Sequence, residues 1–173
     1  MGGGAQPRPG EVTLAHRGAL FLDEFPEFER RVIESLRQPL EDRVIAVSRA
    51  RGTVRFPASF ILIIAMNRCP CGNLGQKGRI CNCTESSLAR YKRKVSGPII
   101  DRIDLWIDVP LIEHEKLSDT GPAGEGSHAI RSRVTKAREI QRARFAGTGI
   151  LTNAEMGVRE LKCYAPLSET CRA

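Results

Sequence analysis

Short apolar runs that lead into polar residues recur along the first part of the sequence. Leu20–Leu22 is followed directly by Asp23 and Glu24. The longer run Phe60–Ala65 ends two residues before Asn67. Continuous apolar runs of this length predict parallel strands that are buried on both faces. Because ligands bind at the carboxyl ends of such strands, the pattern predicts an α/β fold with two acids and an amide at one edge of a parallel sheet.

An acidic pair beside a neutral amide suits a magnesium nucleotide. Mg²⁺ prefers one or two carboxylates together with phosphate oxygens, so Asp23 is the candidate acid for the metal. Glu24 can orient or deprotonate the attacking water. Asn67 can hydrogen-bond a phosphate oxygen or that water without adding charge. The alternative is a buried strand that ends in a solvated acidic turn, with Asn67 as an ordinary turn residue.

The residues that follow the acidic pair have helical spacing. Phe28, Val32 and Leu36 recur every four residues and define one apolar face. Pro26 suits the first turn of a helix. Pro39 is expected to end it, because the residue before a proline is disfavoured in the helical region.

Alternating β-branched and polar residues on both sides of Gly52 predict a β-hairpin over 43–56. Its tip carries Arg49 and Arg51. Arginines at a hairpin tip can contact the phosphates of nucleic acid, or they can serve solubility alone. The residues by themselves leave both interpretations open.

Four of the six cysteines form two Cys-x-Cys pairs that flank a Gly-rich loop, namely Cys69, Cys71, Cys81 and Cys83. Four thiolates can bind one tetrahedral Zn²⁺, and the glycines permit the return turn. The alternative is a set of unligated thiols in an insertion, since Cys-x-x-Cys is the more familiar spacing. Catalytic zinc is disfavoured, because four sulfurs close the coordination sphere.

Beyond the cysteines, the sequence predicts a basic helix over Glu85–Lys94 and a third strand over Leu105–Val109. Arg102 lies just before this strand. A guanidinium is always charged and forks onto phosphate oxygens, so Arg102 is a candidate for reaching the γ-phosphate of a neighbouring subunit. A local ion pair with Asp101 or Asp104 is the alternative.

The pattern loosens after residue 110. Residues 111–128 are polar and Gly-rich and are typical of a linker. A basic amphipathic helix is expected over Ile130–Arg144, within a helical C-terminal part that covers 129–173. Residues 1–110 then make up the α/β part.

Charge and composition add constraints on partners and compartment. The chain has 27 Lys and Arg against 20 Asp and Glu, a net charge of +7, which favours a polyanionic partner such as nucleic acid. No apolar run is long enough for a membrane span. The N-terminus lacks the pattern of a signal peptide, so we expect a cytoplasmic protein. Cysteines in that compartment are more often metal ligands or free thiols than disulfides.

Four blocks of the sequence together resemble one family. These blocks are Pro9–Phe28, which includes Ala-Leu-Phe-Leu-Asp-Glu-Phe, Ser48–Gly52 (Ser-Arg-Ala-Arg-Gly), Ala65–Gly72 (Ala-Met-Asn-Arg-Cys-Pro-Cys-Gly), and Ser96–Leu105. In this order they are similar to the bacterial magnesium-chelatase-like AAA+ ATPases of the ComM/YifB type. The resemblance implies a partial AAA+ P-loop NTPase core, with the hairpin and the Cys-rich loop as insertions and the start of a helical lid over 129–173.

The resemblance also implies roles for individual residues. Asp23 and Glu24 match the Walker B acids, Asn67 matches sensor 1, and Arg102 matches an arginine finger that acts across a ring interface. The hairpin with Arg49 and Arg51 matches the pre-sensor 1 hairpin, which faces the pore where DNA would pass. ATP and Mg²⁺ are the implied cofactors, and structural Zn²⁺ is a variable accessory. The implied assembly is a homo-oligomeric ring such as a hexamer.

The sequence departs from the family at the phosphate-binding loop. It contains no Gly-x-x-x-x-Gly-Lys-Ser/Thr, the loop whose backbone N–H groups cradle the phosphates. We therefore expect a segment of an AAA+ protein that runs from the Walker B strand to the start of the lid and does not hydrolyse ATP by itself.

Three functions follow as hypotheses. The first is part of a motor that couples ATP hydrolysis to DNA remodelling, such as branch migration or helicase activity in recombination or natural transformation. The second is a zinc-stabilised nucleic-acid-binding or assembly module without ATPase activity. The third is a magnesium-chelatase-type subunit, which the basic hairpin disfavours mildly.

Overall fold

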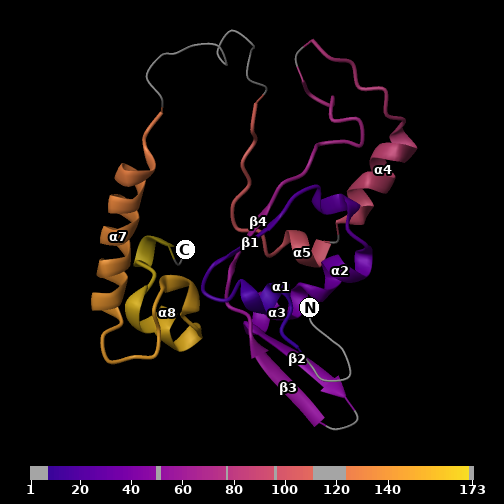
Figure 1. Cartoon of the computed structure of the whole chain (residues 1–173). Helices are drawn as coiled ribbons and strands as arrows, with labels where there is room; N and C mark the ends of the chain where they lie inside the picture. The colour runs from indigo at the N-terminus through magenta and orange to yellow at the C-terminus, as the bar shows by residue number, and fades with distance from the viewer. Residues whose placement is uncertain (1–7, 50–51, 77, 96, 111–123, 172–173) are drawn as a thin grey trace. The chain divides into compact units, whose positions relative to one another are not determined.

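The computed structural model describes residues 8–49, 52–76, 78–95, 97–110 and 124–171 (Figure 1). The chain divides into two compact units, Met1–Ile112 and Glu113–Ala173. The helices and strands of the first unit are α1 (Glu11–Leu14), β1 (Ala19–Leu22), η1 (Phe25–Glu27), α2 (Arg30–Ser35), α3 (Arg37–Asp42), β2 (Val44–Arg49), β3 (Gly52–Pro57), β4 (Ile61–Ile64), α4 (Glu85–Lys94) and α5 (Gly97–Ile100). Those of the second are α7 (Ser127–Arg144), η2 (Asn153–Glu155), α8 (Val158–Tyr164) and η3 (Glu169–Cys171).

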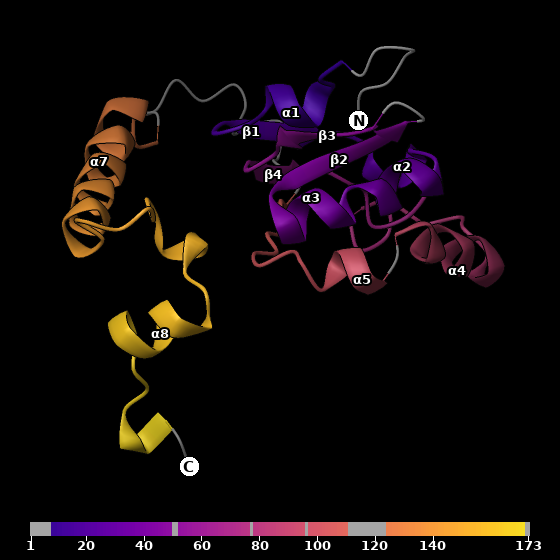
Figure 2. The same cartoon turned by 90° about the horizontal axis from the view of Figure 1, so that it is seen from below.

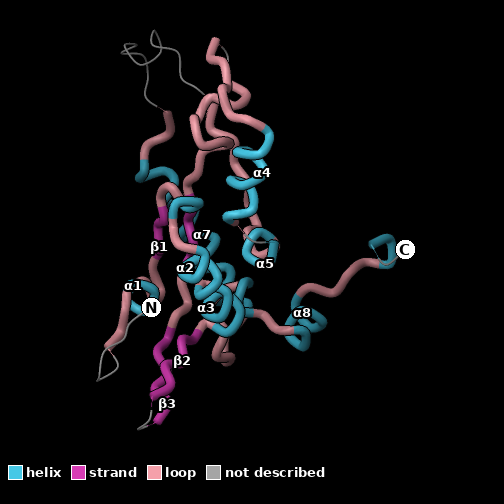
Figure 3. Tube along the Cα trace, turned by 90° about the vertical axis from the view of Figure 1, so that its right-hand side faces the viewer, coloured by secondary structure: helices cyan, strands magenta, loops and turns pink. Residues whose placement is uncertain are grey.

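The two apolar runs form a parallel pair of strands, which confirms the mixed α/β class. Ala19 of β1 pairs with Ile61 of β4, and Leu22 pairs with Ile64. The strands are not buried on both faces, however, because Phe21 is 59% exposed. The described part of the sheet contains only these two strands, and α4 and α5 lie on one side of it (Figures 2 and 3). One face of the strands therefore packs on the core and the other does not.

The predicted hairpin is confirmed. β2 and β3 pair antiparallel, from Val44 opposite Pro57 to Arg49 opposite Gly52. Gly52 has a φ of 136°, a backbone conformation that residues with a side chain rarely adopt. The hairpin leads away from the β1–β4 pair (Figure 1).

A single apolar cluster holds the first unit together. It gathers side chains from the helices, from the hairpin and from the segments beside them, namely Val12, Phe25, Ile33, Leu36, Ile45, Val47, Ala58, Val95 and Ile99. Each large apolar side chain buried in this way stabilises the fold by about 1.5–3 kcal/mol. The inner sides of β1 and β4 contribute Leu20, Leu22 and Ile64, which pack against this cluster.

The helix predicted after the acidic pair is present in a different form. Phe25–Glu27 is a 3₁₀ turn, and α2 begins only at Arg30. Ile33 and Leu36 face the core, whereas Val32 is 44% exposed. Pro39 does not end the helical region: it lies in the first turn of α3, where its missing N–H has no intrahelical acceptor to lose.

The third predicted strand is wrong. Residues 105–109 have no regular secondary structure, and Leu105 and Val109 are more than four-fifths exposed. Strand backbone needs a hydrogen-bonding partner, and none of the described strands pairs with this run.

The predicted helices at 85–94 and 130–144 both form. α4 has the expected bounds, and α7 begins three residues earlier than expected, at Ser127. Every residue of α7 is at least partly exposed, including those of its apolar side. After α7, Phe145 is buried and packs edge to face against Tyr164 of α8, with ring centroids 5.2 Å apart. The predicted linker at 111–128 lies mostly outside the described residues.

Candidate functional site

The parallel pairing of β1 and β4 sets the geometry of the candidate nucleotide edge. Leu22 and Ile64 are directly paired, so the two strands end at the same level. Beyond them, the Ala65 N–H donates to the Leu22 carbonyl at 2.9 Å, and the Phe25 N–H donates to the Ala65 carbonyl at 3.1 Å. The acidic pair follows the first strand and Asn67 follows the second, which is the arrangement that the two apolar runs predicted.

The backbone turns sharply at the acidic pair. Glu24 has φ 49° and ψ 40°, in the left-handed region. Its N–H donates to the Asp23 carboxylate at 2.8 Å. A residue with a side chain in this region costs about 1–3 kcal/mol, and such residues cluster at functional sites. Asp23 and Glu24 are both exposed, so both carboxylates are accessible to a ligand.

Arg102 follows α5 and is held within the first unit. Its guanidinium forms an ion pair with Glu41 of α3 and also donates to the Pro98 carbonyl. The ion pair therefore spans two elements and is not the local pair with Asp101 or Asp104 given as the alternative. The Nε atom of Arg102 is buried without a hydrogen-bond partner among the described residues.

The hairpin arginines lie at the limit of the described residues. The backbone of Arg49 is the last position of β2, opposite Gly52. Arg51 lies outside the described residues, and the structure does not describe the side chain of Arg49. The predicted contact with nucleic acid stays a prediction.

The four cysteines of the two Cys-x-Cys pairs come together in space. Their sulfur atoms all lie within 4.8 Å of one another. The Sγ of Cys71 is 3.4 Å from that of Cys69 and 3.6 Å from that of Cys81. Zn–S bonds of about 2.3 Å in a tetrahedron place sulfurs roughly 3.8 Å apart, so this cluster is close to the dimensions of a Cys₄ zinc site. The arrangement is compatible with the predicted metal site, and zinc binding stays a prediction.

The surroundings of the sulfurs also suit a metal. The Leu74 N–H donates to the Cys69 sulfur at 3.3 Å, an outer hydrogen bond of the kind that tunes a thiolate ligand. The backbone N–H of Asn73 and hydrogen bonds from Cys83 and Cys69 lower the pKa of Cys71 to about 6. Hydrogen bonds with the neighbouring thiols and burial raise the pKa of Cys83 to about 12, and the pKa of Cys81 is also raised. Metal ligands must be deprotonated, so a metal that binds here would displace the protons of these thiols.

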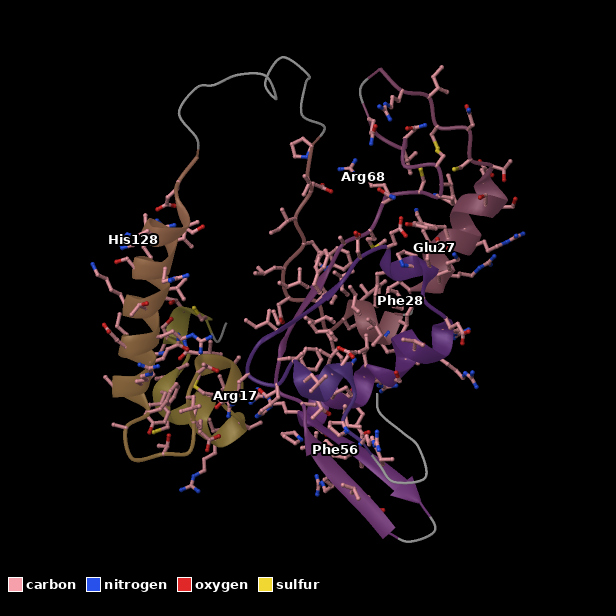
Figure 4. The ribbon with its side chains drawn as sticks, viewed as in Figure 1. Arg17, Glu27, Phe28, Phe56, Arg68 and His128 are labelled. Carbon is pink, nitrogen blue, oxygen red and sulfur yellow. The ribbon has the colours of Figure 1, made fainter. Side chains whose placement is uncertain are left out.

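The Gly-rich loop is needed for its backbone conformation. Gly72 and Gly75 each have a φ of 76°. A Cβ on Gly75 would lie 2.7 Å from the Arg68 guanidinium. Arg68 itself lies where the chain passes from β4 to the cysteines, and it forms an ion pair with Asp108 at 2.9 Å (Figure 4).

Sequence reasoning missed the contacts that connect α4 with Asn67 and with the turn after the acidic pair. The Tyr91 hydroxyl donates to the Asn67 carbonyl at 3.0 Å, and Lys94 forms an ion pair with Glu27 at 2.8 Å. The one available signal was a single aromatic residue within a strongly basic helix. Helical spacing alone does not say what a tyrosine contacts, so the pairings required the fold.

Comparison with known proteins identifies the class. The family described as magnesium chelatase, subunit ChlI, matches residues 1–117, and its C-terminal family matches residues 124–173. The chain therefore belongs to the magnesium chelatase subunit ChlI family of AAA+ proteins.

Within that family, the chain is similar to proteins of the ComM/YifB type. It is 44% identical to the competence protein ComM of Haemophilus influenzae over 94% of this chain and 31% of ComM. It is 47% identical to the uncharacterized protein YifB of Escherichia coli over 82% of this chain and 28% of YifB. An uncharacterized protein of Mycobacterium bovis is 40% identical over 90% of this chain and 30% of its own length. The chain thus spans about a third of the length of these relatives.

None of the described helices is both long enough and apolar enough to span a membrane. This agrees with the lack of a long apolar run in the sequence. The cytoplasmic compartment stays a prediction.

Proposed function

We propose that this chain supplies the acidic edge, the sensor and the arginine finger of an AAA+ motor that hydrolyses ATP and remodels DNA. The observation that supports this most is the pairing of β1 with β4, which brings Asp23–Glu24 and Asn67 to the same edge of one parallel sheet. Membership of the ChlI family supports nucleotide and Mg²⁺ use at that edge.

The residues at the edge fit a magnesium nucleotide by their chemistry. Asp23 would hold the hydrated metal, because its carboxylate is exposed and hard cations prefer oxygen ligands. Glu24 would orient the attacking water and accept its proton, and Asn67 would hydrogen-bond the water or a phosphate oxygen. Bound Mg²⁺ would neutralise charge on the phosphates. The cradle for those phosphates has no counterpart motif in this sequence.

Arg102 can serve as a finger only if it leaves its present partner. Its guanidinium is paired with Glu41, so reaching a nucleotide on a neighbouring subunit requires that this pair opens. The pair is partly exposed, and exposed pairs typically contribute about 0–1 kcal/mol. That cost is small compared with the effect of an arginine finger, which raises the rate of turnover by a factor of about 10³–10⁵.

DNA is the proposed substrate, and the assembly is a homo-oligomeric ring. Support comes from the net charge of +7, from the basic hairpin tip with Arg49 and Arg51, and from the similarity to a relative named as a competence protein. Branch migration or helicase activity during DNA uptake or recombination is the form of remodelling that we propose.

Structural zinc is the second part of the proposal. Cys69, Cys71, Cys81 and Cys83 fit a closed Cys₄ site by their sulfur separations and by the amide donor on Cys69. Four protein ligands leave no open position for a substrate, so the metal would stabilise the loop and take no part in hydrolysis.

The second candidate function is a zinc-stabilised nucleic-acid-binding module without ATPase activity. The net charge of +7 and the clustering of the four cysteines favour it. ATP turnover and DNA binding, measured on the purified chain, separate the candidates. We expect salt-sensitive DNA binding without turnover from the chain alone. A second measurement uses a protein in which this chain is joined to a phosphate-binding loop. If that protein hydrolyses ATP, and Glu24→Gln lowers its ATP turnover at least about a hundredfold, the motor is supported. No turnover in that joined protein would favour the binding module.

A further inference from the structure

Helix α4 starts at the cysteine cluster. Cys83 is followed directly by Thr84, the N-cap of α4, whose hydroxyl accepts a hydrogen bond from the Ser87 N–H at 3.2 Å. Closing the four thiolates around a metal would fix Cys83, and with it the first turn of the helix. The position of α4 is thus connected by covalent bonds to the geometry of the cluster.

The same helix contacts the end of β4. Tyr91 is 6% exposed, and its hydroxyl donates to the carbonyl of Asn67 at 3.0 Å. Asn67 is only two residues before the buried ligand Cys69. Burial and the nearby Glu27 carboxylate raise the pKa of Tyr91, so the hydroxyl remains protonated and can donate.

The C-terminal end of α4 contacts η1, the turn that follows the acidic pair. The Lys94 ammonium lies 2.8 Å from the carboxylate of Glu27. Glu27, which is labelled in Figure 4, is the last residue of the 3₁₀ turn that follows Glu24. Lys94 also lies 6.0 Å from the centre of the Tyr91 ring. One helix therefore contacts Asn67 after β4 and the turn that follows Glu24 after β1.

We infer that Tyr91 is a positioning residue that couples the four-cysteine cluster to the nucleotide edge, with α4 as the connecting element. This inference rests on the proposed zinc site and on the proposed role of Asn67. Metal bound at the cluster holds α4, and the Tyr91 hydroxyl then fixes the Asn67 carbonyl and so the direction of the Asn67 side chain. Lys94 does the same for the turn after Glu24.

The coupling has to be reciprocal. If bound metal strengthens the contact of Tyr91 with Asn67, that contact must strengthen metal binding by the same factor. A neutral hydrogen bond of ordinary strength corresponds to a factor of about two to ten. Tyr91→Phe removes only the hydroxyl and keeps the buried ring, so it should leave the fold intact.

The test compares Tyr91→Phe with Tyr164→Phe, the same change at the only other tyrosine in the sequence. Co²⁺ titration, followed by thiolate-to-metal absorption, measures metal affinity. NMR of labelled protein follows the Asn67 carbonyl carbon and the Phe25 amide with and without Zn²⁺. We expect Tyr91→Phe to keep the thiolate-to-Co²⁺ absorption bands (the cobalt bands) but to bind Co²⁺ about two- to tenfold more weakly. The response of the Phe25 amide to zinc should fall by at least about half.

The outcomes separate the coupling from the proposals on which it rests. Tyr164→Phe should behave like the unmodified chain in every measurement. Normal affinity together with an unchanged zinc response in Tyr91→Phe would overturn the coupling and leave the zinc site standing. No cobalt bands in the unmodified chain would overturn the zinc site itself. Because neither readout depends on ATP turnover, failure of the motor proposal would not be mistaken for failure of the coupling.

Discussion

The guanidinium of Arg102 forms an ion pair with the carboxylate of Glu41, which lies in α3 and also contacts Arg37 at 3.2 Å. One acid thus anchors two arginines, one on its own helix and one just after α5. We expect Glu41→Gln to lower the free energy of unfolding by about 0.5–1 kcal/mol at low salt, because the pair is only partly exposed. Urea unfolding at low and high salt measures this, and the loss should shrink at high salt.

Glu34 offers a matched control for that measurement. It lies 3.9 Å from Arg30, whose side chain is 79% exposed. Glu34→Gln should change the free energy of unfolding by less than Glu41→Gln does. Equal effects of the two substitutions would mean that Arg102 is not held by Glu41 in solution.

The zinc proposal predicts one metal ion per chain. Loss of an outer-shell partner typically costs 10–100-fold in metal affinity, so replacing a ligand, as in Cys81→Ser, should cost more than about a hundredfold. Mass spectrometry under native conditions and competition with a chelator measure stoichiometry and affinity. Cys163→Ser is the control, because Cys163 is exposed and lies in the second unit. Equal zinc content in the two variants would contradict the four-cysteine site.

The buried face of α2 gives a prediction about stability. Ile33 is 1% exposed and belongs to the core cluster, whereas the neighbouring Val32 lies largely outside it. Ile33→Ala should lower the free energy of unfolding by about 2–5 kcal/mol, and Val32→Ala by less than about 1 kcal/mol. Denaturant unfolding measures both. A larger loss from Val32→Ala than from Ile33→Ala would mean that the buried face of the helix is the one predicted from the sequence, with Phe28, Val32 and Leu36.

That pair of residues shows where sequence reasoning succeeded and where it failed. Strong local signals predicted β1, β4, the hairpin and α4, because each is specified by the pattern of apolar and polar residues within it or by the turn residues next to it. The buried face of α2 was predicted only in part: Leu36 is buried as expected, but its buried neighbour is Ile33 and not Val32, and the 3₁₀ turn at Phe25–Glu27 makes the helix begin later than expected. Four-residue spacing does not reveal where a helix begins.

The failures at longer range have a different cause. Leu105–Val109 has the composition of a strand, but a strand also requires a neighbour, which no local pattern supplies. Likewise, the alternative given for Arg102 was an ion pair with Asp101 or Asp104, and it pairs with the distant Glu41 instead. The cysteine cluster could be predicted because metal-ligand spacing is itself a local signal. The contact of Tyr91 with Asn67 could not be predicted, because it joins residues 24 positions apart.

The last prediction concerns the hairpin tip. If Arg49 and Arg51 contact DNA phosphates, the double substitution Arg49→Ala/Arg51→Ala should weaken DNA binding at every sequence tested. It should also make the plot of log binding constant against log salt concentration less steep, by the amount expected for the loss of about two phosphate contacts. Fluorescence anisotropy over a range of salt concentrations gives both quantities. The chain offers a control in Arg131→Ala/Arg138→Ala, two arginines of the basic helix α7.

The control decides between a local contact and a diffuse effect of charge. Both double variants remove the same formal charge, so a general attraction between a basic protein and DNA predicts equal losses from each. A specific hairpin contact predicts a much larger loss, and a larger change in salt slope, from Arg49→Ala/Arg51→Ala. Equal losses would mean that the hairpin arginines serve solubility, and a larger loss from the α7 variant would move the DNA contact to the second unit.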